Sequence, residues 1–246
     1  MFKDKLKSLL FIIKINVFDI LFFVAFLTAL VMSITLTVKK DLIYIAPIVI
    51  ITLIIKYISI TKKKADPLFL LALFAFLGLN FLSFYSFNKY FNIISLLTSG
   101  YLILFTLLLK KYLVKSKLKS FLSLSVIIGF FLVTYIIYSV VDLLMGHIPN
   151  NNMVFVIICA LCLFIYAITF AIIYISDNYA NGTILLTSGV ATIFNLGLSP
   201  INEYFLYSQT FTVLILICHY MSLYLFMKFI SETKVIKAKD VKPNYF

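Results

Sequence analysis

The chain consists mainly of long, nearly uncharged apolar runs separated by short polar segments. Most of these runs reach the ~20 residues that an α-helix needs to cross the hydrocarbon core of a bilayer. Within a run the apolar residues are continuous and do not alternate with polar ones, which favours helices over the strands of an outer-membrane barrel. The sequence therefore predicts an all-α, polytopic transmembrane helical bundle.

The pattern predicts about eight spans in a single domain over residues 17–230. The expected spans lie near Val17–Val38, Leu42–Ile60, Pro67–Tyr85, Phe91–Leu109, Phe121–Leu144, Met153–Ile175, Gly182–Leu198 and Ser208–Ile230. A basic amphipathic segment at 1–16 precedes the domain, and a lysine-rich tail at 231–246 follows it. The seventh span is the weakest, because it is short and carries Asn195 and Gly197 near its end.

The lysines predict how the chain is threaded. Of the 21 lysines, 18 fall in the N-terminal segment, in the tail (counted from Lys228), or at the loops after the second span (counted from Lys56) and the fourth. Only Lys39, Lys40 and Lys89 fall on the other side. Because lysine accumulates on the cytoplasmic side of membrane proteins, both ends are expected in the cytoplasm, which requires an even number of spans. Lysine without arginine is typical of an AT-rich bacterial genome, so we expect the inner (cytoplasmic) membrane.

Composition excludes several classes of protein. Charged residues make up 12% of the chain, against about 25% in a soluble domain, so too few polar groups are present to coat a soluble globule. The net charge of +12 comes from lysines clustered between apolar runs, which indicates contact with anionic membrane lipids and not with nucleic acid. Cys159 and Cys162 form a CxxC inside an apolar run without a second ligand pair, so no metal or cofactor is expected.

Polar side chains at membrane depth are costly and are therefore the candidates for function. Asn80 lies in the third span, Asp142 near the outer end of the fifth, and Asn195 near the outer end of the seventh. His219 lies midway along the eighth span and is followed by Tyr220. Several of these residues would share the outer half of the bilayer, which lets them line one cavity. As alternatives, the asparagines and the histidine bond neighbouring helices, and the aspartate reaches water.

Three stretches resemble the YhhN-type lysoplasmalogenase family. Residues 67–82, PLFLLALFAFLGLNFL, resemble its third-span region, where an apolar helix runs into a Leu-Gly-Asp-like element. Gly189–Leu198 and Phe211–Leu225 resemble its closing pair of helices. The resemblance implies an eight-span intramembrane hydrolase that cleaves the vinyl ether of lysoplasmalogens with two acidic residues. The matching positions here are Asn80 and Asn195, whose amides do not titrate near neutral pH.

Three functions stay open on these grounds. The first is a diverged YhhN-like protein with a lipid-accessible cavity, in which Asn80, Asn195 and Tyr220 contact a lipid substrate. Any vinyl-ether hydrolysis would then use Asp142 or His219 as proton donor or base.

The second is a non-catalytic membrane subunit of a transport or secretion complex, with membrane-protein partners. The third is a small-solute or lipid transporter, which predicts helix breaks at matched positions, whereas Pro47 is the only proline expected in mid-span. Convergence of the polar residues on a cavity would favour the first function, and scattering onto helix contacts would favour the second.

Overall fold

Every regular element in the described residues is helical. The structure is a computed structural model that describes residues 17–35, 39–113, 124–148, 152–176, 178–205 and 207–233. Its long helices are α2 (Val17–Thr35), α3 (Ala46–Thr61), α4 (Pro67–Ser86), α5 (Phe91–Leu113), α6 (Leu124–Met145), α7 (Met153–Ile175), α8 (Gly182–Tyr204) and α9 (Gln209–Glu232). The short 3₁₀ helices η1 (Lys39–Tyr44) and η2 (Lys62–Lys64) flank α3. The segment 1–16 and most of the tail lie outside the described residues.

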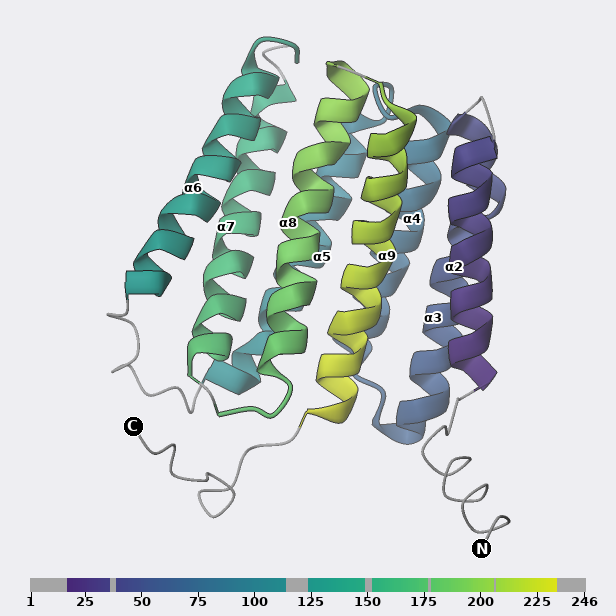
Figure 1. Ribbon diagram of the computed structural model, residues 1–246, viewed down its shortest axis with the longest axis vertical. Helices are drawn as coiled ribbons and strands as arrows, with labels where there is room; N and C mark the ends of the chain where they lie inside the picture. The colour runs from purple at the N-terminus through teal and green to yellow at the C-terminus, as the bar shows by residue number, and fades with distance from the viewer. Residues whose placement is uncertain are drawn as a thin grey trace, which may run out of the picture.

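The described chain contains eight helices that are long and apolar enough to cross a membrane, with η1 and α3 forming one of them. The prediction of an all-α, eight-span bundle is confirmed, and the protein is a multi-pass integral membrane protein. The helices stand side by side, and α2 begins at the same end of the bundle at which α9 ends (Figure 1). We call this end of the bundle the lower end and the opposite end the upper end, as they are drawn in Figure 1.

Helix α6 lies at one edge of the bundle, and α2 and α3 lie at the other (Figure 1). The α8–α9 hairpin is the most extensively packed pair, and α5 packs on both α4 and α7. By contrast, α6 packs mainly on α7 and α8, and very little of its surface is buried inside the bundle. Helix α6 is therefore a peripheral helix with most of its surface available to lipid.

The end of α8 differs from the sequence prediction. We expected the seventh span to stop at Leu198 and the next nine residues to form an outer loop, but α8 continues through Pro200 to Tyr204. A proline inside a helix removes one backbone hydrogen bond. Membrane helices tolerate this loss where neighbouring helices surround the break, and here Pro200 is a buried residue in the wall of the helix bundle's interior. The seventh span is therefore a full-length helix of 23 residues.

The position of Pro47 also differs from the expectation. It lies in the first turn of α3 and not in mid-span, because η1 forms the upper part of this span. A proline is tolerated in a first helical turn, where its missing N–H would have no intrahelical partner. Within the described residues, the proline inside a long helix is Pro200.

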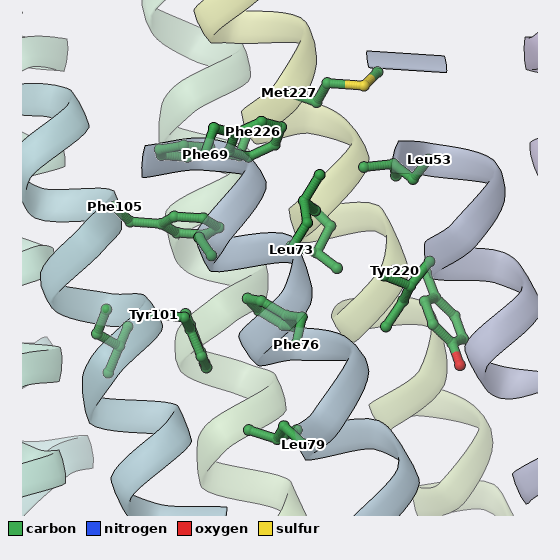
Figure 2. Packing of buried hydrophobic residues seen from close by; sticks show 14 of the residues in the cluster. Leu53, Phe69, Leu73, Phe76, Leu79, Tyr101, Phe105, Tyr220, Phe226 and Met227 are labelled. Carbon is green, nitrogen blue, oxygen red and sulfur yellow. The ribbon is translucent and has the colours of Figure 1, made fainter. Parts of the chain in front are cut away.

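Aromatic rings fill the lower half of the bundle between α4, α5 and α9 (Figure 2). The rings of Phe105 and Phe226 stack with centroids 4.0 Å apart and an interplanar angle of 10°. The ring of Phe69 stacks on that of Phe226 with centroids 5.9 Å apart. The ring centroids of Phe76 and Tyr101 are 4.0 Å apart. Such rings gain dispersion and quadrupole contacts that lipid does not provide in the same geometry. They make the lower half a closely packed layer.

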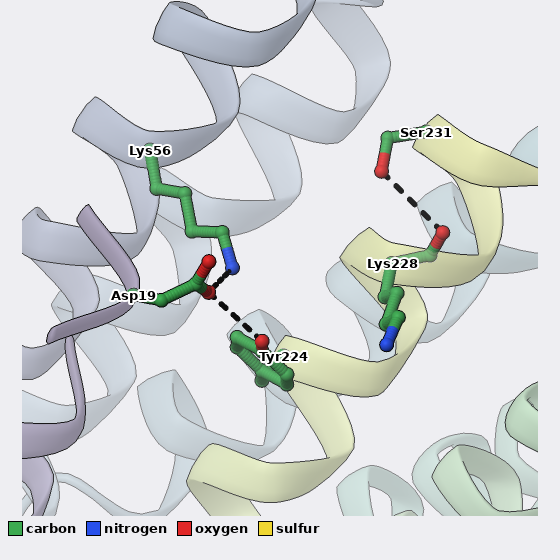
Figure 3. A network of polar contacts seen from close by, with 5 residues as sticks. All are labelled: Asp19, Lys56, Tyr224, Lys228 and Ser231. Atoms are coloured by element: carbon green, nitrogen blue, oxygen red, sulfur yellow. Dashed lines mark hydrogen bonds and ion pairs between the residues drawn. The ribbon is translucent and has the colours of Figure 1, made fainter. Parts of the chain in front are cut away.

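An ion pair lies inside this lower half (Figure 3). Lys56 of α3 pairs with Asp19 of α2, and the Lys56 side chain is only 5% exposed. Tyr224 of α9 donates its hydroxyl to the same carboxylate at 2.9 Å, while the Lys56 ammonium lies 4.1 Å from the centroid of the Tyr224 ring. The lysine pattern had counted Lys56 with the loop residues, but the structure places it within a span. Two opposite charges can stay at this depth because they neutralise one another.

Candidate ligand-binding cavity

A cavity of about 160 Å³ lies in the upper half of the bundle, and six helices, α4 to α9, contribute to its wall. Most of the wall is aliphatic or aromatic, with hydroxyl groups of Ser83, Ser95, Thr98 and Ser199 and with larger polar side chains at two levels. The deeper level holds Asn80, Asn195 and His219, and the level near the upper end holds Asn202, Glu203 and Thr212. Three of the residues singled out from the sequence thus meet at one cavity.

At the deeper level, α8 and α9 are joined by a hydrogen bond between Asn195 and His219. The Asn195 amide nitrogen lies 3.1 Å from His219 Nδ1, and both side chains are buried. Because an amide nitrogen only donates, Nδ1 accepts and the neutral imidazole carries its proton on Nε2. Nε2 is buried without a hydrogen-bond partner in the described structure. His219 lines the cavity, but its unpaired N–H is buried and does not itself open onto the cavity.

Asn80 is held at the cavity by Tyr220, which stands behind it. The Asn80 amide nitrogen donates to the Tyr220 hydroxyl at 3.3 Å, and that hydroxyl donates to the carbonyl of Ala46 at 3.2 Å. Tyr220 is fully buried and is not part of the cavity wall. It was a candidate for substrate contact, whereas the structure gives it the role of fixing Asn80 between α3, α4 and α9.

Asp142 lies elsewhere. It is an exposed residue near the upper end of α6 and does not line the cavity. Phe131, Tyr135 and Tyr138 precede it at helical spacing and are 67%, 70% and 62% exposed, so the four residues form one stripe. The cavity is lined instead by the other face of α6, around Val140 and Val141. The structure therefore does not bring Asp142 together with the other candidates.

The polar residues near the upper end were missed in the sequence analysis. Asn202 donates from its amide nitrogen to the Thr212 hydroxyl at 3.1 Å, and its amide oxygen accepts from the Ser208 amide at 2.9 Å. Glu203 lies in the last turn of α8. Because the seventh span was expected to stop before Pro200, Asn202 and Glu203 were assigned to a loop. The spacing of Asn195, Ser199 and Asn202, which repeats one helical face, is the signal that could have revealed them.

The two levels are well separated along the bundle axis. The Asn195–His219 and Asn202–Thr212 hydrogen bonds set the antiparallel register of α8 against α9. Glu203 follows Asn195 by eight residues, which at 1.5 Å per residue is about 12 Å along the helix. The Glu203 carboxyl and the His219 imidazole therefore lie at opposite ends of the cavity, too far apart to act together on one bond. This arrangement suits binding better than paired acid–base catalysis.

A second hollow of about 240 Å³ lies between α6 and α7, against the side of the cavity. It is a groove lined by apolar and aromatic side chains, including the exposed Tyr138, Ile157 and Leu161. Ile137, Val141 and Ala160 line both the groove and the cavity. A single layer of side chains therefore separates the cavity from the outer surface of α6 and α7.

The cavity is closed toward the lower end by packed rings. The His219 ring lies 5.0 Å from Phe76, which packs in turn on Tyr101. Both aromatic side chains are fully buried. The upper cavity therefore ends on the aromatic layer of the lower half.

The described residues contain no group of three or more His, Cys, Asp or Glu side chains that could hold a metal ion. Cys159 belongs to the cavity wall, and all three cysteines are free thiols. No protein-family model, curated protein or solved structure matches the chain. The function is therefore argued from the cavity itself.

Proposed function

We propose that the protein binds a single-chain, lipid-derived amphiphile in the upper cavity, as a diverged YhhN-like protein that does not hydrolyse it. The observation that carries this proposal is the convergence of Asn80, Asn195 and His219 on one cavity. Polar groups inside a membrane bundle are costly unless they have partners. A cavity with aliphatic walls and a few hydrogen-bonding groups is typical of a small-molecule site.

The chemistry of the wall supports binding without turnover. To hydrolyse a vinyl ether, an acid adds a proton to the outer alkene carbon and water adds to the carbon that carries the ether oxygen. The resulting hemiacetal then breaks its C–O bond, which releases an aldehyde and an alcohol. Asn80 and Asn195 supply amides, which do not transfer protons near neutral pH. His219 and Glu203 lie about 12 Å apart along the helix axis, and Asp142 lies outside the cavity.

We expect single-chain amphiphiles to stabilise the protein without being consumed. A 1-O-alkenyl glycerol and a lysoplasmalogen, which share the vinyl ether, are added separately to protein in lipid nanodiscs. At least one should raise the Tm, and no aldehyde should be released. Ala160→Phe places a ring in the wall shared by cavity and groove, so it should abolish the rise in Tm because the ligand loses its space.

Val154→Phe is the matched control, because Val154 lies on the same helix and is 60% exposed at the outer surface. It should keep the full rise in Tm. The proposal fails if neither amphiphile raises the Tm, or if Ala160→Phe responds as strongly as the natural chain. Aldehyde release would contradict the absence of hydrolysis. If Asn80→Asp/Asn195→Asp gains aldehyde release, that gain would support the YhhN-like assignment.

The transporter and membrane-subunit hypotheses predict different observations. A transporter has to open a path past Phe76 and Tyr101, which fill the bundle below the cavity. A membrane subunit of a larger complex should co-purify with a stoichiometric partner in mild detergent. A monodisperse monomer that still binds the amphiphile would count against the subunit hypothesis.

A further inference from the structure

We infer that the cavity holds the head of the amphiphile, that this head is glycerol-sized and carries no negative charge, and that the chain leaves between α6 and α7. This inference rests on the proposed function and adds the class of ligand and its orientation. It follows from the volume of the cavity, the charges in its wall, its hydrogen-bonding groups and the groove beside it.

The volume limits how much of an amphiphile the cavity can enclose. A protein cavity of roughly 150 Å³ holds one benzene molecule, and the cavity here measures about 160 Å³. Glycerol is about the size of benzene and fits, whereas a whole lipid chain does not. One end of the amphiphile therefore occupies the cavity, and the rest lies outside it.

The charges in the wall oppose an anionic head. The chain has 21 lysines, yet none of them lines the cavity in the described structure, and Glu203 is the charged side chain that does. Lys89 lies near the upper end, but it is exposed on the turn between α4 and α5, and its ammonium lies 5.5 Å from the centroid of the Tyr90 ring. A buried phosphate without a cationic partner is strongly unfavourable. The enclosed head is therefore uncharged or cationic.

The hydrogen-bonding groups suit a head with hydroxyls. At the deeper level, Asn80 and Asn195 line the cavity with amide groups, which donate and accept hydrogen bonds. At the upper level, a carboxyl group such as that of Glu203 can accept hydrogen bonds. Glu203 lies about 12 Å from Asn195 along the axis of α8. A polyol head both donates and accepts, so it can use either level. A purely apolar head would form no hydrogen bond with these groups.

The groove between α6 and α7 provides the exit for the chain. Its lining is apolar except for the hydroxyl groups of Thr134 and Tyr138. It shares Ile137, Val141 and Ala160 with the cavity wall, and its other side faces the surface of the bundle. Because α6 packs mainly on α7 and α8 and very little of its surface is buried, a small shift of this helix would open the shared layer. The chain then continues directly into the surrounding lipid.

The experiment uses the absence of tryptophan from the chain. Phe164→Trp places one indole in the groove, and Leu27→Trp places one on the distant lipid-facing side of α2. Each variant, in lipid nanodiscs, is titrated with three probes that carry the same dibrominated acyl chain, whose bromines quench indole fluorescence. The heads are glycerol, an amine and glycerol phosphate, and the reporter at Leu27 measures quenching by bulk lipid.

We expect the glycerol or amine probe to quench Phe164→Trp at about tenfold lower mole fraction than the phosphate probe, which corresponds to about 1.4 kcal/mol. Leu27→Trp should respond equally to all three. Adding Glu203→Gln to Phe164→Trp should narrow the difference, because the substitution removes the acidic group from the cavity wall. Preferential quenching by the phosphate probe would overturn the inference while leaving the proposed function intact. If no probe quenches Phe164→Trp more than Leu27→Trp, both the inference and the proposed function fail.

Discussion

Replacing Gly189 by alanine should lower the free energy of unfolding by about 1–3 kcal/mol, the usual cost of overpacking, and leucine should cost more. A Cβ atom at Gly189 would lie 2.5 Å from Cδ1 and 2.7 Å from Cζ of Phe170. The Phe170 ring is buried in the core, so it has little room to move. Small residues allow membrane helices to approach closely, and here the glycine lets α8 meet α7. Thermal unfolding of purified protein measures the loss.

Gly100→Ala is the matched control, because no atom lies within 4 Å of a Cβ placed there. It should leave the Tm unchanged or raise it slightly, since alanine favours the helix over glycine. Phe170→Leu should rescue Gly189→Ala in part by making room for the new methyl group. Equal Tm values for Gly189→Ala and Gly100→Ala would contradict the close packing of α7 on α8.

Asp19→Asn should be the most damaging change to the buried ion pair, with a loss of roughly 3 kcal/mol. Asparagine can still accept a hydrogen bond from the hydroxyl of Tyr224, so the variant removes mainly the negative charge. It leaves Lys56, whose side chain is 5% exposed, without its counter-charge. Lys56→Met should cost less, because the Asp19 side chain is 26% exposed and can reach polar surroundings.

The double variant Asp19→Asn/Lys56→Met separates the loss of the pair from the cost of one unpaired charge. Replacing both partners of a buried ion pair is often close to neutral, so the double variant should be more stable than Asp19→Asn alone. Unfolding of the four proteins under one set of conditions gives the cycle. If the two single losses simply add, the charges do not interact and the arrangement of α2, α3 and α9 is wrong at this point.

The number of spans could be predicted from the sequence because the membrane itself constrains the length of the apolar runs and the distribution of lysines. Neither depends on how the helices pack. The end of α8 could not be predicted in this way. Pro200 is a strong local signal for a helix end, but Pro200 is buried in the bundle and α8 continues past it to Tyr204. Glu203 was assigned to a loop for the same reason.

For the candidate site, the sequence predicted how deep the residues lie in the membrane but not which side chains face the cavity. Asn80, Asn195 and His219 were selected because they are polar residues at membrane depth, and the structure places all three at the cavity. Asp142 has the same depth but lies on the outer face of α6. Depth follows from position along a run, whereas the direction of a side chain depends on which face of its helix packs. In a membrane span the packed side and the lipid-facing side are both apolar, so the sequence carries little amphipathic pattern from which to read that face.

The most direct test of the central claim is to locate a bound amphiphile by photo-crosslinking. A single-chain alkyl glycerol with a diazirine on the chain carbon next to its head is irradiated with the protein in membranes, and modified peptides are identified by mass spectrometry. Our account predicts adducts in α8 between Asn195 and Glu203 and in α9 between Thr212 and His219, which Ala160→Phe should remove and Val154→Phe should not. Adducts spread over the outer surfaces of the helices and unchanged by Ala160→Phe would contradict it.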